Sequence, residues 1–197
     1  MILGVDIGGT LIKLGLVRGR RILFQQVFST RPWSSSPAAL QNGLVEAIRT
    51  LLRRHPVQAV GIGIPGLVRY PQGIVDSCAN LLGWKKIPLR ANLTRRLRLP
   101  VQVDNDVHAM TLAEWRYGAG WGARNLLCLT LGTGVGGGLV LDGKLYRSPQ
   151  GPAAEIGHIP LGEEGPSCFC GGRACLEGYV GNREIVRAVQ RRLRSGE

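Results

Sequence analysis

The chain has 197 residues, of which 25 are Lys or Arg and 13 are Asp or Glu, giving a formal net charge of +12. Hydrophobic residues make up 44% of the sequence, which is typical of a folded protein and excludes a disordered one. No apolar run approaches the roughly 20 residues of a membrane span. The N-terminus lacks the basic region of a signal peptide, so we expect a soluble, cytoplasmic protein.

The first part of the sequence predicts three strands, then helices that alternate with further strands. Apolar runs over 2–7, 11–17 and 21–28 predict the strands, with glycine turns between them. A helix is predicted after Ser36-Pro37, because leucine and isoleucine recur at helical spacing as far as Leu51. Further along, the pattern predicts a buried strand over 57–64, a loop-rich stretch, a basic helix carrying Arg90 to Arg98, and a strand over 101–103.

The second part opens with a helix at Asp104-Asn105-Asp106 and continues with strands over 126–131 and 139–141. Asp142-Gly143 predicts a hairpin turn. The alternation of strands and helices predicts an α/β fold with mixed sheets, divided near Asp106 into domains 1–106 and 107–197.

The arginines form runs, the last of which extends from Arg183 to Arg194. Basic runs can bind nucleic acid, but apolar residues interleave with these at helical spacing. We therefore interpret the runs as the solvated faces of amphipathic helices and expect no nucleic-acid or membrane partner.

Two glycine-rich turns, each between two strands, are candidate phosphate sites. Glycines let backbone N–H groups approach an anion, and the first turn adds the hydroxyl of Thr10. Asp6, just before that turn, suits Mg²⁺ held through water. The same residues also fit a plain tight hairpin, and the first turn alone leaves both interpretations open. The candidates are Gly8, Gly9 and Thr10 in the first turn and Gly132, Thr133 and Gly134 in the second.

The second turn formally matches the G-x-G-x-x-G pattern, which requires a helix to begin at the glycines. A strand and hairpin follow here instead, so a dinucleotide-binding fold is excluded. What is left is a strand–turn–strand phosphate site.

The triplet Asp104-Asn105-Asp106 lies where a strand ends and a helix begins. A carboxylate at that place suits a general base that accepts the proton of a substrate hydroxyl in phosphoryl transfer. Asn105 offers a donor and an acceptor, which fits a polyol. Asp and Asn are also favoured as helix N-caps, and the residues alone leave open whether the triplet serves catalysis or capping.

Three of the five cysteines fall within eight residues, shortly after a histidine. An odd cysteine count without a secretory signal argues against a disulfide framework. Three thiolates and one imidazole instead form the ligand set of a closed, structural zinc site. The predicted ligands are His158, Cys168, Cys170 and Cys175, whereas Cys78 and Cys128 are expected to pack as small apolar residues.

Taken in order, these motifs resemble the ROK family of bacterial sugar kinases and sugar-responsive repressors. The resemblance covers residues 2 to about 181 and is most specific where Glu155-Ile156-Gly157-His158 precedes the cysteines; the other motifs that carry it are 6–10, 61–66, 80–84, 105–106 and 131–138. It implies an actin-like (ribonuclease H-like) ATPase fold with two domains around a cleft. It also implies ATP-dependent phosphorylation of a hexose, glucose first, at its primary hydroxyl, and a homodimer.

Carried onto this chain, the resemblance makes Asp106 the catalytic base and gives sugar contacts to Asn105, Glu155, His158 and Glu177. It implies that ATP phosphates lie at the two glycine turns, with Mg²⁺ near Asp6. His158 would then use one ring nitrogen for zinc and the other for the sugar.

This sequence departs from the family at a few positions. Leu11 stands where many members carry Lys, His108 where Asn is usual, and Ala154 where Gly is frequent. Family kinases run to roughly 300 residues, in line with two domains of ordinary size, so the second domain is expected to be incomplete.

The alternative function is a sugar-binding module or regulator without a complete ATP site. The first phosphate turn and Asp106 favour the kinase, and family repressors carry an N-terminal DNA-binding segment that is not expected before Asp6. Which hexose is used, and whether ATP or polyphosphate is the donor, stays open.

Overall fold

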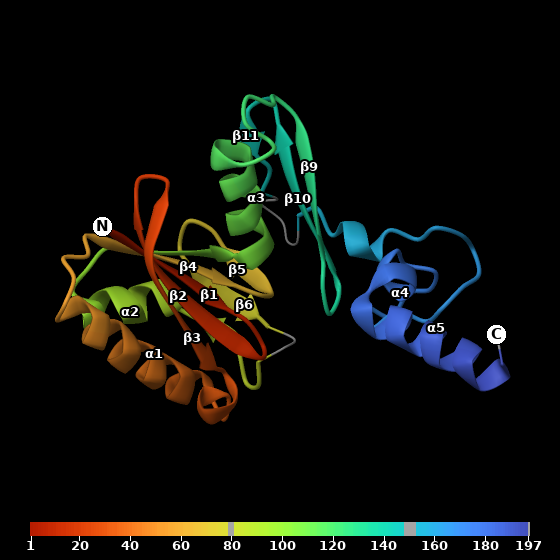
Figure 1. Cartoon of the computed structure of the whole chain (residues 1–197), viewed down its shortest axis with the longest axis horizontal. Coiled ribbons are helices and arrows are strands. Elements are labelled where there is room, and N and C mark those ends of the chain that lie inside the picture. The colour runs from red at the N-terminus through yellow and green to blue at the C-terminus, as the bar shows by residue number, and fades with distance from the viewer. Residues whose placement is uncertain (79–80, 148–152, 197) are drawn as a thin grey trace. The chain divides into compact units, whose positions relative to one another are not determined.

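The computed structural model describes residues 1–78, 81–147 and 153–196 (Figure 1). The chain divides into two compact units, Met1–Ala109 and Met110–Glu197. The division falls in helix α3 (Asp106–Tyr117), at whose first residue the sequence analysis placed the domain boundary.

The first unit is built on a five-stranded sheet with the strand order β3-β2-β1-β4-β8. Strands β1 (Ile2–Ile7), β2 (Leu11–Arg18) and β3 (Arg21–Ser29) form an antiparallel meander. Strands β4 (Ala59–Ile64) and β8 (Val101–Asn105) extend the sheet in parallel with β1. The parallel strands bring the ends of β1, β4 and β8 to one edge, where Asp6 and Asn105 lie.

Two helices cover one face of this sheet, and the core lies between them and the strands (Figure 1). Helix α1 (Pro37–Leu52) begins where predicted, because the Ser36 hydroxyl accepts a hydrogen bond of 3.1 Å from the N–H of Ala39. Helix α2 (Leu89–Leu97) contacts α1 and β8. The predicted apolar face of α1 is buried, and Cys78 packs in the same core.

The stretch after β4, which was predicted to be loop-rich, forms a second, three-stranded sheet. Its strands are β5 (Leu67–Arg69), β6 (Ile74–Ser77) and β7 (Lys85–Ile87). Runs of three or four residues are too short to show an alternating pattern, and β7 contains two lysines, so no strand signal was visible in this stretch. Asn80, the first residue of the 80–84 motif, lies outside the described residues.

The second unit contains most of α3 and a three-stranded sheet of β9 (Leu126–Leu131), β10 (Val135–Leu141) and β11 (Lys144–Leu145). Asp142 and Gly143 both have positive φ angles, 49° and 71°, so the predicted hairpin turn is present.

Strand β10 begins at Val135, four residues before the predicted start, so the glycine turn ends sooner than predicted and Gly136, Gly137 and Gly138 belong to the strand. These glycines serve close packing. A Cβ at Gly138 would collide with the Thr111 side chain, and one at Gly137 would collide with the Ala154 carbonyl.

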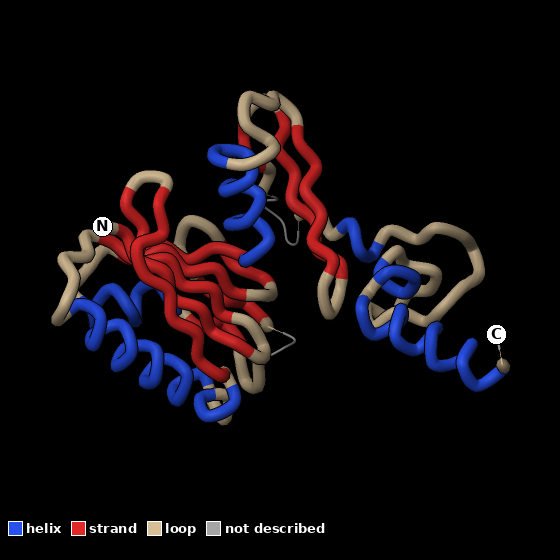
Figure 2. Tube along the Cα trace, in the orientation of Figure 1, coloured by secondary structure: helices blue, strands red, loops and turns tan. Residues whose placement is uncertain are grey.

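The end of the chain has little buried surface. It contains a short helical turn at Ile156–His158, helix α4 (Glu177–Val180) and helix α5 (Asn182–Ser195), which contacts α4 (Figure 2). Helix α5 is amphipathic as predicted, but its large apolar residues are between 47% and 72% exposed. Within the described part of the chain, no helix is both long and apolar enough to cross a membrane.

Candidate functional site

The first glycine turn joins β1 to β2 and presents Gly9 and Thr10 to solvent. It is closed by a hydrogen bond of 2.8 Å from the Gly8 N–H to the Leu11 carbonyl. A Cβ at Gly8 would lie only 2.9 Å from that carbonyl oxygen, so a larger residue would open the turn. The turn therefore has the small residues and exposed backbone that an anion site requires.

Thr30, which the sequence analysis did not single out, holds this turn from behind. It is fully buried, and its hydroxyl donates to the Gly8 carbonyl at 2.8 Å. Its N–H donates to the Thr10 carbonyl at 2.9 Å. Only the pairing of β2 with β3 brings Thr30 to the turn, so no local pattern could have identified it.

Asp106 is the first residue of α3 and lies beside the end of β1. Gly63 pairs with Asp6 across the sheet, and a Cβ at Gly63 would lie 3.3 Å from the Asp106 Cα. The N–H of Val107 donates to Asp106 Oδ1 at 2.9 Å. Burial raises the pKa of the Asp106 carboxyl, the Val107 hydrogen bond opposes the rise, and the nearby Asp6 carboxylate adds to it.

Asn105 performs the capping role that the sequence left open. Its side-chain oxygen accepts from the N–H groups of Val107 at 2.9 Å and His108 at 3.1 Å. Its amide donates to the Gly66 carbonyl at 3.0 Å, which uses one of the two amide N–H groups. These bonds fix Asn105 and the start of α3 against the loop after β4.

Asp6 forms an ion pair with Lys13, the residue opposite it on β2. Lys13 Nζ lies 3.1 Å from Asp6 Oδ2, and both side chains are about half exposed. Lys13 was not among the residues that the sequence analysis singled out.

The second glycine turn, Gly132 to Gly134, joins β9 to β10 and is tied to the helices at the end of the chain. The Asn182 N–H donates to the Gly132 carbonyl at 3.0 Å. Glu177 Oε2 accepts a hydrogen bond of 2.8 Å from the N–H of Val135. Glu177, expected at the sugar, thus also contacts the second turn directly.

The predicted zinc ligands converge within the second unit. The candidate ligand atoms of His158, Cys168, Cys170 and Cys175 all lie within 4.8 Å of one another. The Cys170 and Cys175 sulfurs are 3.8 Å apart, and Cys168 Sγ is 3.4 Å from His158 Nδ1. Because a tetrahedral zinc with Zn–S bonds of about 2.3 Å places its sulfurs about 3.8 Å apart, the geometry fits zinc.

The pKa shifts of the thiols also favour a bound metal ion. Burial, together with the neighbouring thiols Cys168 and Cys170, raises the pKa of Cys175 to about 12. A hydrogen bond from the Gly172 N–H lowers the pKa of Cys170. Three thiolates this close repel one another, so a divalent cation is the natural counter-charge for the cluster.

His158 directs its two ring nitrogens in different directions. Nδ1 faces Cys168, whereas Nε2 lies 4.0 Å from Glu155 Oε2. The sequence analysis expected one ring nitrogen to bind the metal and the other to contact the sugar, and the sugar contact stays a prediction. Ala154, just before Glu155, has a φ of 56°, a conformation that favours glycine.

The structure thus gathers the expected site residues into two groups, one in each unit. The first, in Met1–Ala109, contains Asp6, Gly8, Gly9, Thr10, Asn105 and Asp106. The second, in Met110–Glu197, contains Gly132, Thr133, Gly134, Glu155, His158, Glu177 and the three cysteines.

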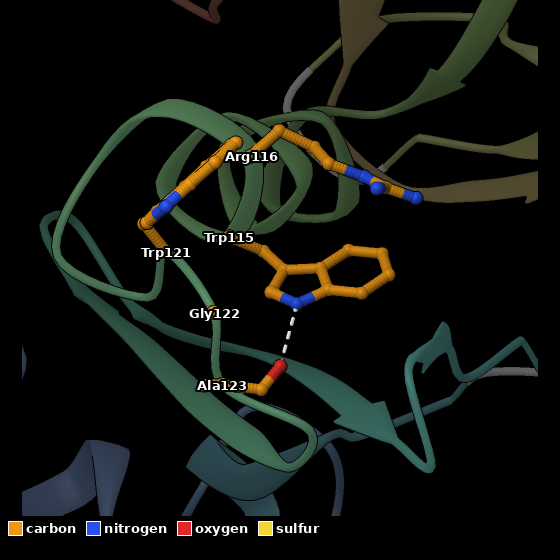
Figure 3. A pocket seen from close by; sticks show the side chains of 5 residues that line it. All are labelled: Trp115, Arg116, Trp121, Gly122 and Ala123. Carbon is orange, nitrogen blue, oxygen red and sulfur yellow. Dashed lines mark hydrogen bonds between the residues drawn. The ribbon is translucent and has the colours of Figure 1, made fainter.

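A separate hollow of about 320 Å³ in the second unit contains none of these residues (Figure 3). The Trp115 indole N–H donates to the Ala123 carbonyl at 2.8 Å, and the Arg116 guanidinium lies 4.0 Å from the Trp115 ring centroid. The Trp115–Ala123 hydrogen bond ties the end of α3 to the loop before β9, so we interpret the hollow as a feature of packing.

The sequence of the whole chain, compared with known families, matches the model described as "ROK family" over residues 2–197. The chain belongs to the ROK family. A glucokinase of Streptomyces coelicolor is 38% identical over 192 residues, which are 96% of this chain and 59% of that protein. A xylose repressor of Caldicellulosiruptor bescii is 28% identical over 99% of this chain and 50% of its own length.

Solved structures confirm the fold. A ROK family glucokinase from Streptomyces griseus, determined in complex with glucose and AMPPNP, has a TM-score of 0.84 and 38% identity, covering 98% of this chain and 61% of that one. The actin-like ATPase fold that the sequence predicted is therefore correct. The chain spans about three-fifths of the length of these glucokinases.

Proposed function

We propose that this chain carries the sugar-binding and phosphate-binding groups of an ATP-dependent hexose kinase, with Asp106 as the general base. The observation that carries the proposal is the position of Asp106, a partly buried carboxyl with a raised pKa near Asp6, the residue at the end of β1 that leads into the first glycine turn. Glucose is the first choice of substrate, because the Streptomyces coelicolor relative is a glucokinase and the Streptomyces griseus structure contains glucose.

In the proposed reaction, Asp106 accepts the proton of the primary hydroxyl. The hydroxyl oxygen then forms a bond to the γ-phosphorus of ATP as the bond from that phosphorus to the β–γ bridging oxygen breaks, and ADP leaves. The Val107 N–H holds Oδ1, so Oδ2 is the oxygen that takes the proton. A raised pKa improves the base, because proton transfer is most efficient when the pKa approaches the working pH.

The sugar contacts follow from the chemistry of the side chains. The second amide N–H of Asn105 can donate to a hydroxyl, and the carboxylates of Glu155 and Glu177 can accept from hydroxyls. His158 would contribute Nε2, the nitrogen directed away from the cysteines.

Each glycine turn is assigned a role in binding the donor phosphates, with N–H donors from Gly8, Gly9 and Thr10 in the first turn and from Gly132, Thr133 and Gly134 in the second. Such fixed backbone donors supply much of the electrostatic stabilisation in phosphoryl transfer. Asp6, a half-exposed carboxylate, would hold Mg²⁺ through water. When bound, Mg²⁺ neutralises charge on the phosphate oxygens.

The zinc site is assigned a structural role. Four protein ligands leave no open position for substrate. Holding His158 and the cysteines together fixes Glu155 and Glu177, which flank the cluster in the sequence, relative to each other.

The alternative is a sugar-binding module or regulator that transfers no phosphate, which the similarity to a xylose repressor supports. Asp106 and the first glycine turn favour the kinase, because sugar binding alone requires neither.

The test is phosphorus NMR of the zinc-loaded chain incubated with MgATP and either glucose or xylose. Xylose is the matched ligand, because it lacks the primary hydroxyl of glucose. We expect a new phosphomonoester signal with glucose and none with xylose or with the Asp106→Asn variant. Binding of glucose without any phosphomonoester would instead support the alternative.

A further inference from the structure

The arginines of the first unit gather at the edge of its large sheet where β1, β4 and β8 begin, opposite the first glycine turn. Ile2, at the start of β1, pairs with Val17 near the end of β2 and with Ala59 at the start of β4. Strand β8 runs parallel to β4 and begins at the same edge. The β2–β3 turn and the ends of α1 and α2, which lead into β4 and β8, therefore lie on this side of the unit (Figure 1). These three segments carry nine arginines, here called the arginine surface: Arg18, Arg20, Arg21, Arg49, Arg53, Arg54, Arg95, Arg96 and Arg98.

Contacts between the three segments show that their arginines share one side of the unit. The Arg49 guanidinium donates to the Arg96 carbonyl at 3.1 Å, which joins the ends of α1 and α2. Phe24, on β3 just after the turn, and His55, in the loop after α1, have ring centroids 6.1 Å apart. Of the nine arginine side chains, Arg96 is half-buried and the other eight are exposed. The fold thus presents to solvent a group of charges that are scattered in the sequence.

Carboxylates do little to neutralise this surface. The unit Met1–Ala109 contains fifteen Lys or Arg residues and only five Asp or Glu residues. Three of these acids, Asp106 among them, lie at the opposite edge of the sheet, and Asp76 pairs with Arg69 at 2.6 Å. Glu46, which lies 3.3 Å from Arg49, is the one acid left for nine arginines. Like charges held together in this way repel one another and attract a polyanion.

Apolar side chains lie among the arginines and narrow the choice of polyanion. On β3, directly after Arg21, Ile22 is 67% exposed, Leu23 49% and Phe24 37%. The bases of a single strand stack on such aromatic and apolar groups, whereas a chain of carboxylates would gain nothing from them. Guanidinium groups also match phosphate oxygens with paired hydrogen bonds.

We propose that the arginine surface binds single-stranded nucleic acid, with the arginines on its phosphates and Phe24 against its bases. Taken one by one in the sequence, the arginine runs were interpreted as solvated helix faces without such a partner. The fold changes that interpretation, because it joins two runs and the β2–β3 turn in one surface. The inference does not rest on the proposed function, since the surface contains none of the residues assigned to the kinase.

The experiment is fluorescence anisotropy of a labelled 20-nucleotide single strand of mixed sequence, titrated with the zinc-loaded chain at several salt concentrations. The test variant removes one exposed arginine from each segment, as Arg21→Gln, Arg54→Gln and Arg95→Gln together. The matched control removes the same charge from helix α5 in the other unit, as Arg191→Gln, Arg192→Gln and Arg194→Gln together, all at exposed positions.

We expect the test variant to raise the Kd at least about tenfold and to reduce the slope of log K against log salt by about 2, since each phosphate contact to a single strand contributes about 0.7. The control should keep both the Kd and the slope. The Tm of the test variant should not fall, because the substitutions remove repulsion at exposed positions. Equal weakening in the two triple variants, or no binding by the wild-type chain, overturns the proposal.

Phe24→Leu tests the base contact separately. It keeps an apolar side chain but removes the ring, so we expect the Kd for the strand to rise at least about fivefold, with no change in the salt slope. Poly-glutamate is the competing ligand. Binding of poly-glutamate as tight as that of the strand, with no effect of Phe24→Leu on either, would replace nucleic acid by an acidic protein and overturn the proposal.

Discussion

The segment from Ile159 to Val180 should depend on zinc for its structure, and Cys175→Ser is the change that tests this. Serine has nearly the same shape as cysteine but is a much poorer zinc ligand. Cys175 is 2% exposed and lies at the centre of the cluster, so its sulfur is in contact with Cys170 and near the His158 carbonyl. The substitution removes one ligand with little change of volume.

The expected loss of stability in Cys175→Ser follows from how few other side chains are buried between Ile159 and Val180. In this stretch, all of which is described, Ala174 and Cys175 are the buried residues. At about 0.8 kcal/mol per buried CH₂, two such small side chains contribute about 1–2 kcal/mol. Structural zinc contributes about 10–16 kcal/mol in small zinc domains. We therefore expect the segment to open in Cys175→Ser.

The assay is hydrogen exchange followed by mass spectrometry, together with zinc analysis. Zinc should fall from one ion per chain to near none in the variant. A local loss of about 4 kcal/mol would lower amide protection in 159–180 by roughly a thousandfold, since each 1.4 kcal/mol is a factor of ten. Protection in β1 and α1, which belong to the other unit, should not change.

Cys128→Ser is the matched control, because Cys128 is a half-buried cysteine in β9 outside the cluster. It should keep its zinc and its protection in 159–180. Full protection of that segment in zinc-free Cys175→Ser would refute the view that the metal holds it together.

Three further predictions concern single residues. Asp106→Asn should raise the Tm at neutral pH. Because the pKa of Asp106 is higher in the folded than in the unfolded protein, the folded protein loses stability as the pH rises from the unfolded to the folded pKa, and asparagine avoids this loss. The gain in Tm should vanish in acid, and a lower Tm of the variant at pH 7 would contradict the prediction. Thr30→Val should cost about 1–3 kcal/mol in urea unfolding by leaving the Gly8 carbonyl unpaired, whereas Thr50→Val, at an exposed helix position, should cost less. Ala154→Gly should stabilise the chain by up to about 1 kcal/mol by relieving its positive φ, and a destabilised variant would show that the strain is absent.

The elements with strong local signals were predicted from the sequence. The apolar repeat and Ser36 predicted α1, and Asp142-Gly143 predicted the hairpin between β10 and β11. The spacing of His158 and the cysteines predicted a cluster because metal ligands so close in sequence have little freedom to lie apart. Each of these signals lies within a few residues.

What the sequence could not predict depends on contacts between distant residues. Thr30 supports the first turn, and Lys13 pairs with Asp6, only because β1, β2 and β3 are neighbours in the sheet. The glycines of β10 were assigned to a turn, since the packing of Thr111 and Ala154 that requires them is not visible in the sequence. The roles of Glu155 and Glu177 at the sugar stay predictions.

The central claim is that this chain binds a hexose and phosphorylates it with Asp106 as the base. The most direct measurement is the rate of glucose-dependent ADP release by the zinc-loaded chain with MgATP, compared with Asp106→Asn at equal zinc content. We predict release that requires glucose and falls by at least about a hundredfold in the variant, the usual contribution of a general base. Equal rates in the two proteins, or no dependence on glucose, would contradict the claim.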